Sequence, residues 1–339
     1  MNGSCLRPGL RQAQPFGSWG IWAAACLLPV PAAAQTVEPW TEAVVSVTNL
    51  NQASQLFRQV GGWTRTHQGA VARAEIDYWR LPSFARANFE RWCAPGTATG
   101  CIRFVRFSNV SQRPIRLAAR AWDTGGIFSI MVRSDNVLAL FDAAIKQGWW
   151  AESEPIGFTF GQSDLRNVVL TGPHGINLAV YQRVAPPFTA FPVGRISQAF
   201  NSMRMVKNRP AARAFYEQGL GFAVLFDSDR EPAEPAPSNF GIPFNLTPQV
   251  KRAAAALQPS PGLETGRVEV MQIEGFTGKD LAAHAVPPNL GLLSVRYPVT
   301  DLSAYRARLA ARGITAAYAA DAVLVGGLGR VNLFAVRDP

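Results

Sequence analysis

The chain has few charges, few histidines and few cysteines for its length of 339 residues. Charged residues make up 17% of the sequence, and there are 3 His and 4 Cys. The formal net charge is +10 at pH 7, but the excess comes from single arginines spread along the chain and not from basic runs. Nucleic-acid binding requires a concentrated basic face with aromatic stacking positions, so the sequence argues against a nucleic-acid partner. The scattered positive charge instead favours small anionic ligands.

Long hydrophobic runs are also absent, and we therefore expect no membrane span in the mature protein. A transmembrane helix needs about 18 or more apolar residues in a row. The first 34 residues instead predict a cleaved signal peptide, because Arg7 and Arg11 precede a short apolar stretch over 21–28 and an A-x-A site follows at 32–34. Since the composition resembles that of bacterial proteins, we expect a periplasmic protein with cleavage near Ala34/Gln35.

Removal of this segment leaves Cys93 and Cys101 as the remaining cysteines. An even pair in an oxidising compartment predicts a disulfide. Turn residues separate two strand-like runs here, so the bond would close a hairpin and stabilise it by about 2–3 kcal/mol. A metal or redox pair is the alternative, which the lack of a nearby His and of C-x-x-C spacing disfavours.

One pattern recurs four times along the chain. An alternating apolar strand is followed by Asn or Asp, a helix and then Gly. The Asn or Asp side chain satisfies free backbone N–H groups at the helix start, and Gly suits the left-handed cap at its end. Strand-length runs then follow the helix. The pattern predicts four strand–helix–three-strand modules, at residues 41–107, 125–183, 199–275 and 289–339.

The runs after the helices mark the remaining strands, and a linker marks the domain boundary. We predict these strands at 74–81, 88–92 and 101–107, at 157–161, 167–170 and 177–182, and at 221–226, 240–246 and 267–273. The fourth module ends where its final strand should begin, which predicts either an open sheet edge or a truncated sequence. The Pro-rich linker 184–198 is expected to be stiff. It divides the chain into a first domain at 35–183 and a second at 199–339.

Two motifs connect this pattern to a known family. Residues 206–222, VKNRPAARAFYEQGLGF, resemble the V-K-D-x-x-x-A-x-x-F-Y-x-x-x-L-G-F run of the vicinal oxygen chelate (VOC) superfamily, which includes glyoxalases, bleomycin-resistance proteins and extradiol dioxygenases. Residues 172–178, GPHGINL, resemble its D-P-D-G-N-x-x turn with both acidic residues lost. The resemblance implies an α+β fold whose modules pair into two cupped sheets with a divalent metal between them. Such a fold hosts many chemistries.

The resemblance places the family's metal ligands at positions that carry few ligating groups here. These positions are Glu42, Arg103, Ile127 and Ala179 in the first domain, and Asn201, Glu269 and Ser294 in the second. A carboxylate facing a guanidinium is an ion pair and not a metal site. The second set offers oxygen ligands that are too few and too weakly charged for tight transition-metal binding. We therefore expect no cofactor, with a divalent metal as the alternative.

The three histidines do not add a metal site. His67 and His174 lie in predicted turns, and His284 lies in a helix-like stretch. None has the spacing of a ligand pair. This disfavours an iron centre of the 2-His-1-carboxylate type.

Strand alternation predicts which side chains line the two cups. The first cup would contain Glu42, Ser46, Arg103, Ser129, Asn177 and Tyr181. The second would contain Asn201, Met203, Met205, Glu269, Met271, Ser294 and Arg296. Methionines suit either a core or the apolar floor of a pocket. Glu269 needs a partner if it is buried, and Arg296 is the candidate; otherwise Glu269 lies solvated at the rim.

Three functions stay open at this point. The first is a metal-free protein of the bleomycin-resistance type that holds an anionic or aromatic small molecule in the second cup. The second is a glyoxalase-like lyase or isomerase, or a ring-cleaving dioxygenase, with Glu269 or Glu42 as base or sole charged ligand. The third is an interaction module whose open fourth sheet pairs with another chain. The lack of His favours the first, and a homo-oligomer is compatible with each.

Overall fold

Four strands, each followed by a capped helix, begin the four modules. The computed structural model describes residues 37–230 and 234–339, so the predicted signal peptide lies outside the described residues. The strands are β1 (Glu42–Ser46), β5 (Ile127–Arg133), β10 (Asn201–Met205) and β14 (Gly291–Arg296). The helices are α1 (Leu50–Gln59), α3 (Val137–Lys146), α4 (Arg209–Ala214) and α5 (Leu302–Ala311). As predicted, an Asn or Asp side chain accepts a hydrogen bond from a backbone N–H of the first turn in each helix.

The remaining elements complete a mixed α+β fold, as predicted. After α1 come β2 (Thr64–Ala70), α2 (Arg73–Tyr78), β3 (Arg86–Cys93) and β4 (Cys101–Ser108). After α3 come β6 (Trp150–Ala151), β7 (Ile156–Phe160), β8 (Ser163–Thr171), η1 (Pro173–Gly175) and β9 (Asn177–Ala185). After α4 come the π-helical η2 (Phe215–Leu220), β11 (Ala223–Arg230), η3 (Phe244–Gln249), β12 (Arg252–Gln258), β13 (Arg267–Ile273) and η4 (Ala282–His284). After α5 come β15 (Tyr318–Val325) and β16 (Gly329–Ala335).

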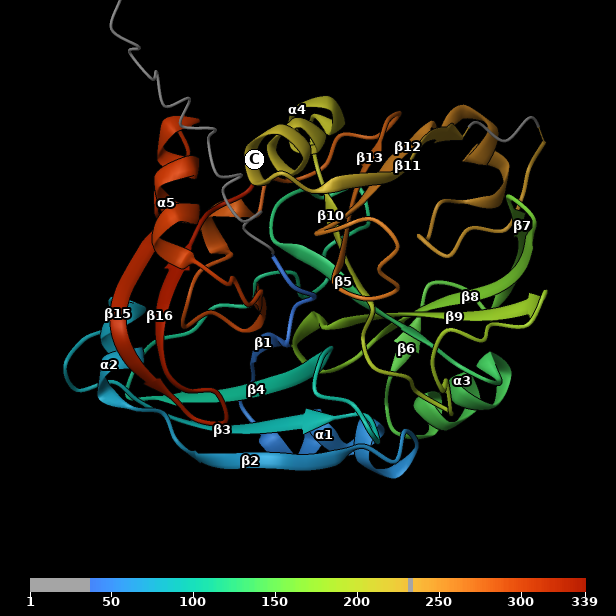
Figure 1. Ribbon diagram of the computed structural model, residues 1–339. Coiled ribbons are helices and arrows are strands. Elements are labelled where there is room, and N and C mark those ends of the chain that lie inside the picture. Colours follow the sequence, from blue (N-terminus) through green and yellow to red (C-terminus); the bar gives the residue numbers. More distant parts are fainter. Residues whose placement is uncertain (1–36, 231–233) are drawn as a thin grey trace, which may run out of the picture. The chain divides into compact units, whose positions relative to one another are not determined.

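The order of the strands shows which modules are partners. The described strands form a five-stranded sheet, β14-β1-β4-β3-β2, a nine-stranded sheet, β11-β12-β13-β10-β5-β9-β8-β6 with β7 on β8, and the pair β15-β16. β1 is antiparallel to β14, and β5 is antiparallel to β10. Figure 1 shows β10 beside β5. The sheets therefore join the first module to the fourth and the second to the third.

The predicted pairing of modules within 35–183 and within 199–339 is wrong. The pattern of a module specifies its own strands, but it contains no signal for which other first strand lies alongside. Consecutive modules do contact each other through their helix-covered faces. Phe57 of α1 and Leu140 of α3 share one core cluster, and Ala212 of α4 and Leu309 of α5 share another. Residues 35–339 form one compact unit.

The fourth module differs from the other three. In the part of the chain that the structure describes, β14 has a strand neighbour on one edge only. The β15–β16 hairpin forms a separate two-stranded sheet and lies near α5 and α2 (Figure 1). The rings of Tyr318 and Tyr78 pack 5.8 Å apart where β15 meets α2.

Two predicted strands are different elements. Residues 74–81 contain α2, and residues 240–246 lead into η3. The strands that take their places in the sheets are β2 and β12. Every residue of β2 is exposed, and β12 is mostly alanine, so neither shows the apolar alternation that marks a half-buried strand. His67 consequently lies in a strand and not in a turn.

The predicted disulfide is present. It joins Cys93, the last residue of β3, to Cys101, the first residue of β4, across a Cα–Cα distance of 4.4 Å. The bond closes the β3–β4 hairpin. No helix among the described residues is long and apolar enough to cross a membrane.

Candidate functional site

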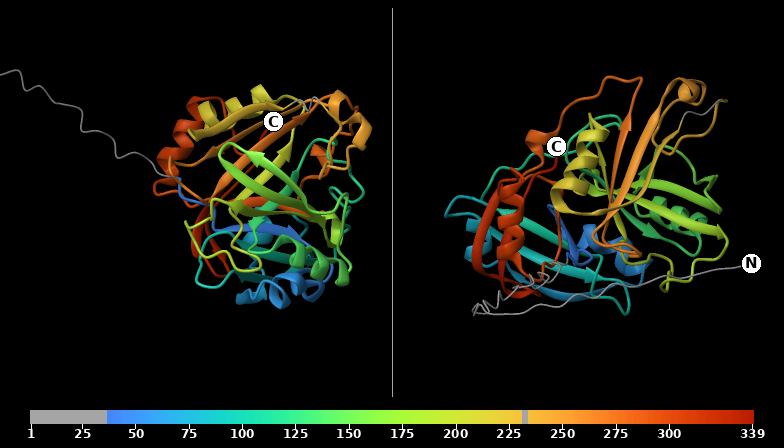
Figure 2. Two further views of the ribbon diagram at one scale, coloured as in Figure 1. Left: turned by 90° about the vertical axis from the view of Figure 1, so that its right-hand side faces the viewer. Right: turned by 45° about the horizontal axis from the view of Figure 1, so that its top comes forward.

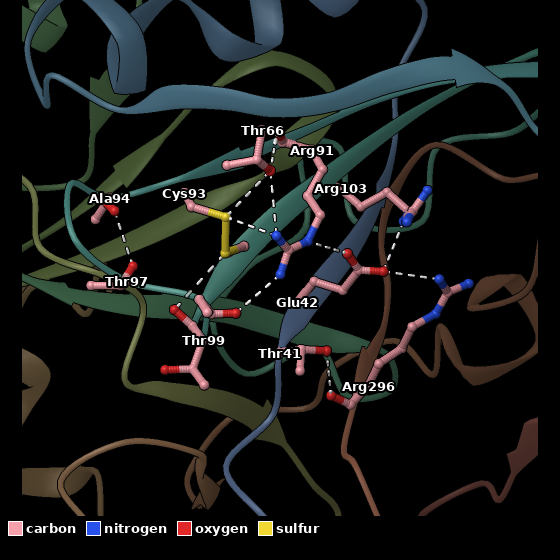
Figure 3. The surroundings of a disulfide bond; sticks show 12 residues. Thr41, Glu42, Thr66, Arg91, Cys93, Ala94, Thr97, Thr99, Arg103 and Arg296 are labelled. Atoms are coloured by element: carbon pink, nitrogen blue, oxygen red, sulfur yellow. Dashed lines mark hydrogen bonds and ion pairs between the residues drawn. A yellow bond between two sulfur atoms is a disulfide. The ribbon is translucent and has the colours of Figure 1, made fainter. Parts of the chain in front are cut away.

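A buried ion-pair network lies on the five-stranded sheet beside the disulfide (Figure 3). Its centre is Glu42, which is fully buried. Arg91 Nε donates to Glu42 Oε2 at 2.9 Å, and Arg103 Nε donates to Oε1 at 2.7 Å. Arg296 Nη1 donates to the same Oε1 at 2.9 Å. Arg296 Nη2 donates to Oε1 of buried Glu75 at 2.6 Å, so this arginine bridges two carboxylates.

The three arginines keep Glu42 ionised. Burial alone would raise the pKa of Glu42, but the guanidiniums of Arg296, Arg103 and Arg91 hold it below its ordinary value. Both carboxylate oxygens already accept charge-assisted hydrogen bonds. Glu42 therefore acts as the counter-ion of the arginines.

The tip of the β15–β16 hairpin closes this first cup. Arg103 donates to the carbonyl oxygen of Gly326, and its guanidinium lies 4.1 Å from the ring centroid of Phe89. A side chain at position 326 would overlap the Phe89 ring, so the tip depends on a glycine there. Protein atoms thus occupy the centre of the cup formed by the first and fourth modules.

The concave face of the nine-stranded sheet is chemically different, since it is apolar with one carboxyl group. Its buried cluster brings together four methionines and several aromatic rings: Met131, Met203, Met205, Met271, Phe128, Phe200 and Phe240. Glu269 of β13 accepts a hydrogen bond from Asn201 Nδ2 of β10 at 3.2 Å. The Asn201 carbonyl oxygen accepts from the Ser202 N–H, which orients the amide toward Glu269.

Burial raises the pKa of Glu269 to about 7, and the hydrogen bond from Asn201 opposes the rise. Near neutral pH this carboxyl group can therefore donate or accept a hydrogen bond. Burial also raises the pKa of Tyr181, helped by the charge of Glu269 and opposed by that of Arg133. Tyr181 thus lies within electrostatic reach of both groups.

The two ends of the sheet that forms this second cup come into contact. Phe160 of β7 and Phe226 of β11 belong to opposite ends of the strand order, yet their rings are in edge contact with centroids 5.2 Å apart. The sheet is therefore strongly curved, and Figure 2 shows the strands of the second and third modules curving around a common interior. Asn239, in the segment before η3, donates to Asn167 of β8 and so joins the third module to the second.

The structure redistributes the predicted site residues between the cups. Asn201, Met203, Met205, Glu269 and Met271 lie together, as predicted, but in a cup completed by the second module. Ser129 and Ala179 pair in register with residues of that cup, and Tyr181 packs against its cluster. Ser294 and Arg296 pair with Val44 and Glu42, so the predicted Arg296–Glu269 pair is wrong. The cause is the pairing of modules described above.

Sequence reasoning missed several members of both sites. Arg91 and Glu75 complete the Glu42 network, but Arg91 lies on β3 and Glu75 on the unexpected helix α2. Arg133 ends β5 on the same face as Met131, a position that alternation could have revealed. His174, a residue of η1, accepts a hydrogen bond from the Thr48 backbone N–H. His284 ends η4. Neither histidine is a hydrogen-bond partner of Glu42 or Glu269 among the described residues.

The chain resembles solved structures more clearly than it resembles known sequences. No protein-family model and no curated protein matches it. A glyoxalase I variant from Zea mays superposes with a TM-score of 0.60 over 90% of each chain at 15% identity. Glyoxalase I from Zea mays gives 0.58 over 90% of each chain at 14% identity. The chain has the VOC fold. At these identities the likeness establishes the fold alone.

The residues at the usual metal position of the VOC fold do not fit a divalent metal in either cup. In the first cup both oxygens of Glu42 are bound by arginines. In the second cup the hydrogen-bond partner of Glu269 among the described residues is the amide of Asn201. Within residues 37–230 and 234–339, no three His, Cys, Asp or Glu side chains gather in a group that could hold a metal.

Replacing Glu42 with Gln should lower the free energy of unfolding by about 3–5 kcal/mol, because it leaves buried arginines without their counter-ion. Urea unfolding at pH 7 measures the change, with Glu38→Gln at an exposed position as control. The folded pKa of Glu42 is lowered, so its contribution is present above the unfolded pKa and is lost on acidification. A loss below about 1 kcal/mol at pH 7 would contradict a central role for the network.

Glu269 should show the opposite pH dependence. Its folded pKa of about 7 exceeds the ordinary 4.5, so the folded state binds the proton more tightly than the unfolded state. The free energy of unfolding therefore falls as the pH rises from 4.5 to about 7. The difference corresponds to about 3 kcal/mol. Unfolding measured from pH 4.5 to pH 8 should show that Glu269→Gln removes this fall, whereas Glu274→Gln, at an exposed position, keeps it. Parallel profiles for wild type and Glu269→Gln would contradict the assignment.

Proposed function

We propose that the protein binds a small organic molecule in the cup formed by the second and third modules, without a metal at the usual VOC position. The contrast between the two cups carries this proposal. In the first, three arginines neutralise Glu42 and a hairpin tip fills the centre. In the second, methionines and aromatic rings accompany one carboxyl group that has no charged partner among the residues the structure describes.

The chemistry of the second cup supports an apolar ligand with few polar contacts. Small-molecule sites are largely hydrophobic, with a small number of polar groups that set the ligand's orientation. Methionine side chains are unbranched and can repack around differently shaped ligands. Glu269 and Asn201 supply the polar contacts.

A neutral fluorescent probe tests the site. N-phenyl-1-naphthylamine should bind saturably. Met271→Gln should lower the affinity for the probe roughly tenfold, because it makes the cup floor polar. Leu138→Gln is the matched control, since Leu138 is exposed on α3. Equal affinity in wild type and Met271→Gln, or no saturable binding, would argue against a site in this cup.

Metal analysis tests the second part of the proposal. The purified chain beginning at Gln35 should contain no stoichiometric Fe, Mn, Ni or Zn. Stoichiometric metal in the wild type that disappears in Glu269→Ala would overturn the metal-free assignment.

One observation favours a second candidate function, a lyase or isomerase reaction that transfers a proton. A carboxyl group with a pKa of about 7 is suited to general base catalysis near neutral pH. Such a base would take a proton from the carbon beside a carbonyl group and return it. In D2O the wild type should then accelerate deuterium exchange into hydroxyacetone, and Glu269→Gln should not. Equal exchange rates would rule this function out for that substrate.

We further propose that the protein acts in the periplasm after removal of residues 1–34. The sequence of that segment supports export. Fractionation of a bacterial host should recover the full chain's product in the periplasm, and a chain lacking residues 2–34 in the cytoplasm. Equal distribution of the two would contradict export.

A further inference from the structure

A second feature of the same cup indicates what kind of molecule it takes. A pocket with a volume of about 200 Å3 lies where β5 and β9 end. Arg133 of β5 and Arg183 and Val184 of β9 line it, together with Pro187 and Phe188 of the linker. Arg133 follows Ser129 and Met131 at alternate positions of β5, and Arg183 follows Tyr181 on β9. Both arginines therefore continue the inner face of the cup.

The two guanidiniums lack full partners. Arg133 is only 7% exposed, its nearest carboxylate oxygen is that of Glu264 at 3.8 Å, and its Nε has no hydrogen bond. The Nε of Arg183 is also buried without a hydrogen bond, and Arg183 forms no ion pair with any described residue. Buried charges are normally paired, so two neighbouring arginines without a close counter-ion indicate a place for an anion.

The other charges near the pocket leave a positive excess. Glu264 is shared, because it also pairs with Arg267 at 3.1 Å. Asp135, which lines the pocket, pairs with Arg195 at 2.9 Å. Three arginines therefore face one shared carboxylate. Burial, Arg183 and Arg267 together lower the pKa of Arg133 to about 10, so it remains protonated at neutral pH.

Aromatic rings hold the guanidiniums in place without occupying their N–H groups. Arg133 lies 4.0 Å from the ring centroid of Phe188 and 4.5 Å from that of Phe200. Arg183 lies 5.6 Å from the Phe188 centroid. Such contacts are made by the face of the guanidinium. The edge, which carries the donors for a carboxylate, is left for a ligand.

We propose that Arg133 and Arg183 bind the carboxylate of a ligand whose apolar body lies in the methionine-lined cup. The ligand class is thus an aromatic or aliphatic monocarboxylate. Tyr181 connects the two regions, since it pairs with Arg133 across β5 and β9 and packs against the methionine cluster. This inference rests on the proposed function for the position of the apolar body, whereas the anion pocket stands on its own contacts.

Calorimetry with phenylacetate tests the pocket, using the chain that begins at Gln35 at low ionic strength. Phenylacetate should bind, and its neutral analogue phenylacetamide should bind at least about tenfold more weakly. Arg183→Gln should lower the affinity for phenylacetate by about 10- to 100-fold, and Arg183→Lys should recover part of that affinity. Arg106→Gln removes the same charge at an exposed position of β4 and should leave the affinity unchanged.

The contrary results are distinct. The anion pocket would be overturned if phenylacetate did not bind or if it bound equally well to wild type and Arg183→Gln. It would also be overturned if the wild type bound phenylacetamide as tightly as phenylacetate. Tighter binding of phenyl phosphate with the same dependence on Arg183 would overturn the carboxylate class. Dependence on Arg183 without dependence on Met271 would refute the proposed cup but keep the pocket. If N-phenyl-1-naphthylamine binds in the cup but Arg183→Gln does not change the affinity for phenylacetate, the cup is kept and the anion pocket is refuted.

Discussion

The structure depends on two antiparallel contacts between first strands, β1 with β14 and β5 with β10. Each contact joins two modules into one curved sheet. It therefore decides which side chains face each other across a cup. Glu42 meets Arg296 because β1 lies beside β14, and Met203 meets Ser129 because β10 lies beside β5. A different pairing of the same modules would produce different sites from the same residues.

The two cups show how one backbone plan can support opposite electrostatics. Glu42 and Glu269 are both buried carboxyl groups on the inner face of a sheet. Three guanidiniums lower the pKa of Glu42, while burial with a single amide partner raises that of Glu269. In the first arrangement both oxygens of the carboxylate are bound by arginines of the protein itself. The second leaves one carboxyl group that can exchange a proton near neutral pH, in an apolar environment.

The linker between the second and third modules contributes to the second cup. Its Phe188 packs on Arg133, and its Ser197 hydroxyl accepts from the Arg133 backbone N–H. The segment thus does more than connect two halves, because it forms one wall of the arginine pocket. This explains why a Pro-rich stretch that reads as a spacer in the sequence is packed against the ends of β5 and β9.

The sequence by itself determined the local structure. Helix caps at Asn49, Asn136, Asn208 and Asp301, the Cys93–Cys101 hairpin and most strands follow from nearby residues, because caps, turns and alternation act over a few positions. Exposed β2 and alanine-rich β12 lacked that signal. Only the tertiary structure decided which modules share a sheet, since strand pairing depends on contacts between residues far apart in the sequence, such as Glu42 and Arg296, which are 254 positions apart. That long-range pairing is why Glu269 is without an arginine and Glu42 has three.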